Sequence, residues 1–285
     1  MLNNKLALGT VQFGMDYGIS NFNGMTTQSE FEHILDFCAS KNLYTLDTAK
    51  SYGESENRIG QYIKKNKDKP WDIITKIKGD VPAKKQIENS IKKLNSIPSA
   101  VLAHDVKDYL NPSFRKDLFF LKHEYSIKKV GVSVYDSNDI LKILDYDHPD
   151  LIQLPLNVLD TRILKSGIIN ELYSKNIEIH VRSVFLQGLF YLPMKMIKSK
   201  FSDVYKTLKK LNEISKKNDL KISELSLLFV SSLSQISKVV VGVNSLDQLQ
   251  THFLTMAKKL DEKLIDEVID INYDNENILN PRLWK

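Results

Sequence analysis

Cysteine is almost absent from this 285-residue chain, which contains a single Cys38. One cysteine excludes a disulfide framework and any metal site built from several thiolates. Cys38 falls on the apolar face of a helix predicted over residues 29–40, so we interpret it as a packed core residue.

Long hydrophobic runs are absent as well. No apolar stretch approaches the ~18 residues that a membrane-spanning helix needs. The first nine residues also lack the basic start and the long apolar core of a secretory signal peptide. We therefore expect a soluble, cytoplasmic protein that has no membrane partner.

Arginine is scarce, because only 5 of the 40 basic residues are Arg, although the net charge is +5. The lysines alternate with acidic residues along the predicted helix faces. A nucleic-acid site needs a clustered basic patch, preferably one rich in Arg with exposed aromatic residues. We expect no nucleic-acid partner.

No linker rich in Pro, Gly or Ser interrupts the chain, so we predict one domain over residues 1–285. Short runs rich in Val, Ile and Leu alternate with amphipathic stretches, which is typical of an α/β (β/α)8 TIM barrel. The predicted strands span residues 5–9, 43–47, 72–77, 100–104, 128–133, 151–154, 178–183 and 238–242.

The predicted helices lie between these strands, near residues 29–40, 54–65, 83–95, 112–123, 137–144, 166–174, 203–216, 223–233 and 246–253. A doubly wound open sheet is the alternative, but no Gly-x-Gly-x-x-Gly motif follows the first predicted strand. The tail 261–285 begins as a helix, and we expect it to lie near the barrel mouth.

Four reactive side chains follow three successive predicted strands. Asp47, Lys76 and His104 end the second, third and fourth strands, and Tyr52 lies in the turn after Asp47. Strand ends of a parallel barrel share one rim, so these side chains should meet. A nearby ammonium would lower the pKa of the Tyr52 phenol from about 10 and help it give up a proton. Asp47 would keep Lys76 charged.

These residues belong to runs through which the chain resembles the aldo-keto reductase family. The most specific run is Asp47-Thr-Ala-Lys-Ser-Tyr-Gly53. Weaker matches, in the order of the predicted strands, cover residues 8–14, 74–76, 104–105, 131–133, 153–157, 183–188 and 242–245. The resemblance implies a tetrad of Asp47, Tyr52, Lys76 and His104, with Tyr52 as general acid. It also implies reduction of a small-molecule aldehyde or ketone without a metal.

The resemblance further implies an extended nicotinamide cofactor across the barrel mouth, with NADPH favoured and NADH as the alternative. Ser133 and Gln153 would hold the carboxamide, the loop 183–188 the pyrophosphate, and Ser245 a phosphate at a helix start. The cofactor residues implied are Gly9, Thr10, Ser133, Gln153, Ser183, Gln187, Gly188, Gly242, Asn244, Ser245 and Gln248.

Several positions depart from the family pattern. Val134 replaces an Asn, and the residues Thr251-His252 replace a Glu-Asn pair. Asn244 stands where a basic residue usually clamps the 2′-phosphate, which removes a strong charge-assisted contact. NADH therefore stays open, unless His252 or a distant lysine supplies the missing charge.

Substrate recognition is weakly encoded. Tyr17, Tyr135, Arg282 and Trp284 are the candidate pocket residues, and core or surface packing is the alternative for each. Trp71 is a weaker candidate. A polar mouth would suit a sugar or a nucleotide-linked sugar. We expect a monomer or a weak homo-oligomer.

Two other functions compete with carbonyl reduction. A barrel that binds the cofactor only to regulate a partner would not need the complete tetrad. A lyase or isomerase that uses Lys76 as a Schiff-base nucleophile would need a desolvated, neutral lysine, whereas Asp47 predicts a charged one.

Overall fold

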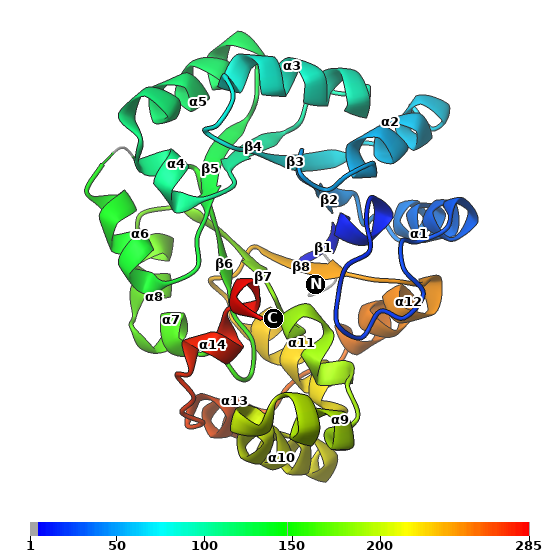
Figure 1. The fold of residues 1–285 in the computed structure, drawn as a ribbon, viewed down its shortest axis with the longest axis vertical. Coiled ribbons are helices and arrows are strands. Elements are labelled where there is room, and N and C mark those ends of the chain that lie inside the picture. Colours follow the sequence, from blue (N-terminus) through cyan, green and yellow to red (C-terminus); the bar gives the residue numbers. More distant parts are fainter. Residues whose placement is uncertain (1–4, 147, 285) are drawn as a thin grey trace.

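The computed structural model describes residues 5–146 and 148–284, so both extreme ends of the predicted domain and residue 147 lie outside the described residues. Within them, parallel strands β1 to β8 pair in sequence order, and β8 pairs with β1 to close a barrel (Figure 1). The predicted (β/α)8 barrel is confirmed. The doubly wound sheet is wrong, because that fold requires two open edges.

The strands form the inner layer. They are β1 Leu6–Gly9, β2 Thr45–Asp47, β3 Asp72–Ile77, β4 Ala100–Ala103, β5 Lys129–Ser133, β6 Leu151–Pro155, β7 Glu178–Arg182 and β8 Lys238–Gly242. Most of their side chains are buried, because one face of each strand points into the barrel and the other packs under helices.

Helices form the outer layer. They are α1 Gln28–Ser40, α2 Ser55–Lys65, α3 Ala83–Leu94, α4 Val106–Leu110, α5 Pro112–Glu124, α6 Ser137–Leu144, α7 Arg162–Lys165, α8 Ile168–Ser174, α9 Met194–Lys200, α10 Ser202–Lys217, α11 Ile222–Ser232, α12 Leu246–Thr255, α13 Glu262–Ile269 and α14 Glu276–Leu279. Three short 3-10 helices are η2 Val11–Phe13, η3 Leu186–Tyr191 and η4 Pro281–Leu283. In the described ranges, no helix is both long and apolar enough to cross a membrane.

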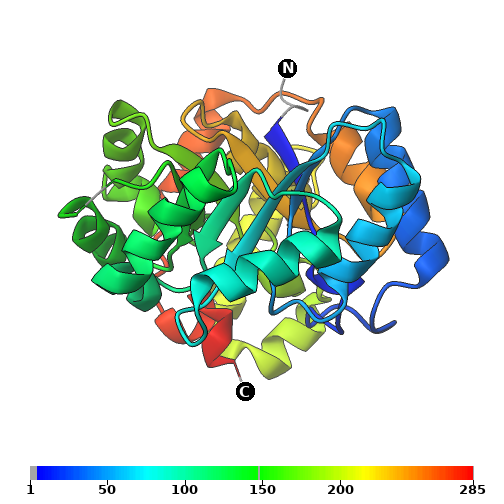
Figure 2. The same ribbon diagram turned by 90° about the horizontal axis from the view of Figure 1, so that it is seen from above.

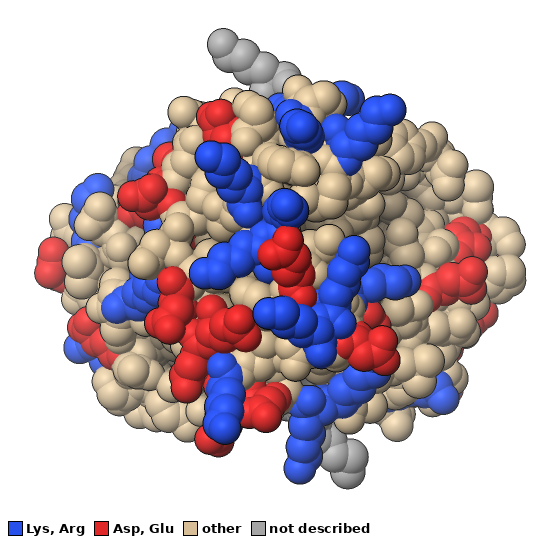
Figure 3. All heavy atoms as spheres, turned by 90° about the horizontal axis from the view of Figure 1, so that it is seen from below, with Lys and Arg blue, Asp and Glu red and all other residues tan. Residues whose placement is uncertain are grey.

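Amphipathic spacing and capping explain the helices. In α10 the buried residues Val204, Leu208, Leu211 and Ile214 recur every three or four positions and so share one face. Thr27 caps α1 by accepting a hydrogen bond from the backbone N–H of Glu30. The flank that carries α9, α10 and α13 shows lysines intermixed with acidic residues (Figure 3).

Strand β2 is shorter than predicted. Its expected first residue, Leu43, instead donates its N–H to the carbonyl of Cys38 over 2.9 Å and closes the end of α1. Asn42 before it takes a left-handed φ of 58°, which turns the chain. Leu43 is therefore buried by the helix end rather than by the strand ladder.

The described part of the chain begins and ends on opposite sides of the barrel (Figure 2). Two contacts attach the segment that follows α13 to α7. Arg162 pairs with Glu276 at 2.7 Å, and Lys165 donates to the carbonyl of Ile271 at 3.0 Å. Arg282 then reaches Asp105, just beyond β4. These contacts attach the tail to α7 and to the segment after β4.

Candidate active site

A cavity opens at the carboxyl ends of the strands, where barrel enzymes carry their active sites. It encloses about 1030 Å³ when its open mouth is included. The predicted residues that line it are Gly9, Thr10, Tyr17, Asp47, Tyr52, Lys76, His104, Ser133, Tyr135, Gln153, Ser183, Gln187, Gly188, Gly242, Asn244 and Gln248. Ser245, Arg282 and Trp284 do not line it.

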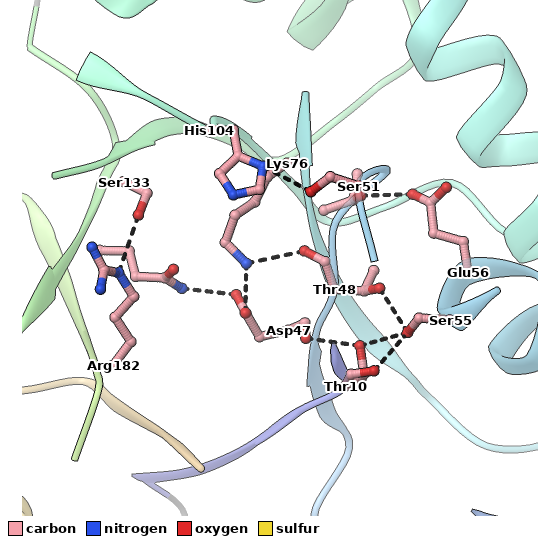
Figure 4. A network of polar contacts seen from close by, with 12 residues as sticks. Thr10, Asp47, Thr48, Ser51, Ser55, Glu56, Lys76, His104, Ser133 and Arg182 are labelled. Carbon is pink, nitrogen blue, oxygen red and sulfur yellow. Dashed lines mark hydrogen bonds and ion pairs between the residues drawn. The ribbon is translucent and has the colours of Figure 1, made fainter. Parts of the chain in front are cut away.

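A buried ion pair lies at the base of the cavity (Figure 4). Lys76 Nζ donates to Asp47 Oδ2 at 2.5 Å and to the carbonyl of Thr48 at 3.0 Å. Both side chains are almost fully buried. Burial alone would lower the pKa of Lys76, but Asp47 and Tyr52 outweigh burial, and the pKa is raised. Lys76 is therefore charged at neutral pH.

Tyr52 lies over this pair. Lys76 Nζ is 5.1 Å from the centre of the phenol ring. Gly14 allows the segment to sit there, since a Cβ on Gly14 would lie 1.8 Å from the Tyr52 carbonyl oxygen. Burial raises the pKa of Tyr52, and the opposing charge of Lys76 offsets only part of that rise. The expected net lowering of this pKa is wrong, because desolvation outweighs the ammonium.

His104 completes the group from the position after β4. Its ring lies edge-on to Tyr52, with centroids 6.1 Å apart, and its Nδ1 lies 3.3 Å from Ser51 Oγ. Burial, followed by the charge of Lys76, lowers the pKa of His104 to about 4. The imidazole is therefore neutral at physiological pH. It can donate or accept one hydrogen bond but carries no charge.

A second layer of hydroxyl groups fixes Asp47. Thr10 Oγ1 donates to the Asp47 carbonyl at 3.0 Å, and Ser55 Oγ lies 2.8 Å from Thr10 Oγ1 (Figure 4). Thr10 lines the cavity, but its hydroxyl is already engaged by the protein. The hydrogen bond of Thr10 to the Asp47 backbone helps to position Asp47.

Ser133 and Gln153 meet on the opposite wall, where β5 and β6 pair them in register. Gln153 is fully buried and donates from Nε2 to Asp47 Oδ1 at 2.7 Å. Its Oε1 has no hydrogen-bond partner among the described residues. A buried acceptor of this kind is costly unless a ligand donor meets it.

The loop after β7 has a strained backbone. Ser183, Leu186 and Gln187 have positive φ values of 59°, 45° and 52°, which non-glycine residues rarely adopt. Gly188 has a φ of 95°, and a Cβ there would lie 2.2 Å from Ser20 Oγ. Strain of about 1–3 kcal/mol per residue persists where the surroundings impose it, and such residues cluster at ligand sites.

A comparison with models of known protein families shows which family the chain belongs to. The family model for the aldo/keto reductase family matches residues 5–272. The chain belongs to the aldo/keto reductase family. A comparison with curated protein sequences found no match.

Solved structures of aldo-keto reductases share the fold. An enzyme of Bacillus halodurans in its holo form aligns with a TM-score of 0.76 and 20% identity over 93% of this chain and 90% of that one. A Klebsiella pneumoniae protein in complex with NADPH aligns with a TM-score of 0.71 and 15% identity, covering 98% of this chain and 90% of the other.

The far end of the cavity reaches the start of α12, where this aldo/keto reductase carries an acidic side chain. Ser245 caps the helix by accepting from the Gln248 N–H at 3.3 Å. Leu246 donates its N–H to Glu30 Oε1, a residue of α1 that is 216 positions away. Asn244 Oδ1 is buried and has no partner in the described chain. A buried acceptor therefore lines this end of the cavity, and the Glu30 carboxylate occupies the neighbouring helix start without lining the cavity.

His252 does not supply the missing cation there. Its ring stacks on Phe185 at 4.8 Å, and burial lowers its pKa to about 4. The imidazole is neutral at physiological pH, so it cannot form an ion pair with a phosphate. Its proposed substitution for a basic residue is wrong for that reason.

The candidate substrate residues separate into two groups. Tyr17 and Tyr135 line the cavity, and Gln187 Nε2 donates to the Tyr17 hydroxyl at 3.0 Å. Trp284 packs on Phe201 with ring centroids 5.0 Å apart, outside the cavity. Trp71 packs on Tyr44 and Tyr62, likewise outside the cavity lining.

Sequence reasoning missed Arg182, which lines the cavity between Ser133 and Ser183. It is the last residue of β7. The sequence contained a signal for Arg182. Lys76 and His104 were selected because each is a polar residue at the end of a predicted strand, and Arg182 meets the same criterion.

Proposed function

We propose that this chain reduces an aldehyde or ketone to an alcohol, with Tyr52 as general acid and NADPH as the reductant. The observation that carries the proposal is the charged Lys76, held by Asp47, directly beneath a phenol that keeps its proton. The neutral His104 lies beside the same phenol. A carbonyl oxygen that is being reduced needs a proton donor, a nearby positive charge and a neutral hydrogen-bonding group. Tyr52, Lys76 and His104 offer these three.

In this mechanism the bound cofactor supplies a hydride to the carbonyl carbon. The Tyr52 hydroxyl gives its proton to the carbonyl oxygen, which becomes the alcohol O–H. The resulting phenolate is stabilised by the Lys76 ammonium, and Asp47 holds that ammonium in place. His104 donates a hydrogen bond to the same oxygen and orients it. Solvent restores the Tyr52 proton.

The cavity fits a dinucleotide at both ends. Gln153 Oε1 is a buried acceptor without a partner and suits a carboxamide N–H. The strained loop at Ser183–Gly188 would follow the pyrophosphate. NADPH in complex with a Klebsiella pneumoniae relative of the same fold supports NADP(H). The carboxylate of Glu30 and the Asn244 acceptor at the far end suit a ribose hydroxyl, which keeps NADH as the alternative.

The Schiff-base alternative conflicts with the charge of Lys76. An amine attacks a carbonyl only when it is neutral, and the contact with Asp47 raises the pKa of Lys76. Borohydride treatment in the presence of substrate should therefore leave Lys76 unmodified. A regulatory barrel would bind NADPH without reducing any carbonyl, and a panel of carbonyl substrates tests for that difference.

A substrate panel tests the proposed function. We expect purified protein to oxidise NADPH in the presence of aldehydes, ketones or open-chain sugars, as followed by the loss of nicotinamide absorbance. The panel should include neutral and charged carbonyls of matched size, and each should also be assayed with NADH. Tight NADPH binding without turnover of any carbonyl would favour the regulatory barrel.

Glu30 gives a prediction about cofactor choice. Its carboxylate occupies the first N–H of α12, and it would repel a 2′-phosphate placed there. Glu30→Gln should strengthen the binding of NADPH about tenfold relative to NADH. Dissociation constants from quenching of protein fluorescence measure the effect. Glu32→Gln on the same helix, which faces Lys65, is the matched control, and an equal change in both variants would refute the role of Glu30.

A further inference from the structure

Arg182 lies beside Ser133, apart from Lys76 and His104 (Figure 4). Its guanidinium donates to Ser183 Oγ at 3.0 Å, to the Val134 carbonyl at 2.7 Å and to Ser133 Oγ at 3.3 Å. A guanidinium has five N–H donors, so these neutral acceptors leave donors free. The side chain is only partly exposed and lines the cavity.

Arg182 differs from the other charged side chains near the cavity mouth in having no oppositely charged partner among the described residues. Lys76 is paired with Asp47, and His104 is neutral at physiological pH. Arg282 has a carboxylate partner, Asp105, at 3.5 Å. Within the described residues no carboxylate forms an ion pair with Arg182. Partly buried charges are normally paired, so this one is available to an anion.

A second guanidinium stacks on the same aromatic ring as the first. The Cζ atom of Arg182 is 4.0 Å from the centre of the Tyr135 ring, and the Cζ atom of Arg282 is 3.4 Å from the same point. Two like charges on one ring repel each other, and Asp105 compensates only one of them. At these distances the two guanidiniums lie on opposite faces of the ring, and only Arg182 lines the cavity. An anion in the cavity would accept the unused N–H donors of Arg182 and offset the repulsion.

We propose that Arg182 binds an anionic group of the carbonyl substrate. The substrate class is then an aldehyde or ketone that carries a carboxylate or a phosphate, with its carbonyl at Tyr52 and its anion beside Tyr135. The inference rests on the proposed reduction and names its substrate class. The cofactor's own phosphates are the other source of the same chemistry, and the experiment below separates the two.

The test uses two pairs of substrates that differ in charge. 4-Carboxybenzaldehyde is compared with 4-carbamoylbenzaldehyde, and glyceraldehyde 3-phosphate with glyceraldehyde. We expect the wild type to favour the anionic member of at least one pair by tenfold or more in kcat/KM. Arg182→Met should lower that ratio by about tenfold or more, to a value near one, since hydrogen bonds to charged groups contribute strongly. Arg182→Lys should lower it less, because it keeps the charge but loses the fork.

Two matched variants locate the effect. Arg282→Met should lower the same ratio more weakly than Arg182→Met, because Arg282 is half-exposed and already paired. Lys209→Met removes one positive charge from the distant surface helix α10, where Lys209 lies 3.9 Å from Glu213, and should leave the ratio unchanged. An equal fall in Lys209→Met would mean a non-specific charge effect and would overturn the proposal.

Binding without turnover separates this inference from the proposed function. Calorimetry on the NADPH-loaded protein should show that 4-(hydroxymethyl)benzoate binds more tightly than its neutral carboxamide, and that Arg182→Met removes the difference. That result would hold even if no carbonyl were reduced. Equal binding of the two compounds by the wild type would overturn the inference. So would a loss in Arg182→Met confined to NADPH affinity, which would assign the guanidinium to the cofactor's phosphates.

Discussion

Replacing Tyr52 with Phe is expected to lower kcat for carbonyl reduction on the order of a thousandfold. The change removes one hydroxyl, and with it the proton that the carbonyl oxygen must receive. The ring and its packing against His104 remain, so the fold and the cavity should be unaffected. Single-turnover measurement of nicotinamide absorbance in the presence of saturating aldehyde gives the chemical step directly.

Cofactor binding is the control for this variant. Because the lost group acts on the substrate oxygen, Tyr52→Phe should bind NADPH within about threefold of the wild type. Retention of full turnover would remove Tyr52 from the role of general acid. A parallel loss of NADPH binding would show that the substitution had disturbed the site rather than its chemistry.

The pH profile of the wild type gives a second readout. Burial raises the pKa of Tyr52, so the protonated acid persists above neutrality and reduction should decline only beyond the usual range of a phenol. His104 has a pKa of about 4 and stays neutral above it. The rate should therefore be flat between about pH 5 and 8, where an ordinary histidine titrates. A break in that interval would contradict a neutral His104.

Replacing Lys76 with Met is expected to have the second large effect. It should lower both kcat and the free energy of unfolding. Asp47 is buried and would lose its counter-ion, leaving an isolated carboxylate in the barrel. Breaking a buried ion pair in this way costs about 3–5 kcal/mol. Chemical denaturation should report that loss. The phenolate would also lose its neighbouring cation, so kcat should fall even in the folded fraction.

The double variant Asp47→Asn with Lys76→Met separates the two roles of Lys76. Removing both charges leaves no buried ion, so most of the lost stability should return. Activity should not return, because the ammonium that stabilises the Tyr52 phenolate is still missing. Recovery of activity along with stability would show that Lys76 acts only through the fold.

The sequence pattern predicted the rim of the active site because position along a strand is a local property. Asp47, Lys76 and His104 follow apolar runs of strand length, and in a parallel barrel all such ends face one side. The same criterion covers Arg182, which ends β7, although the prediction did not include it. Sequence alone thus determined the fold and predicted many of the residues that line the cavity, but it did not include Arg182, and Ser245, Arg282 and Trp284 lie outside the lining.

The tertiary structure decided how those residues behave. The pKa of Tyr52 depends on the balance between burial, which raises it, and the charge of Lys76, which lowers it. In the folded barrel burial has the larger effect, so the pKa is raised. The contact of Glu30 with α12 and the approach of Arg282 to Tyr135 join segments far apart in the chain. Local periodicity carries no information about such contacts, because they depend on how the barrel closes. The sequence by itself predicted which side chains meet at the base of the cavity, and the assembled barrel decided how burial and neighbouring charges shift their pKa values.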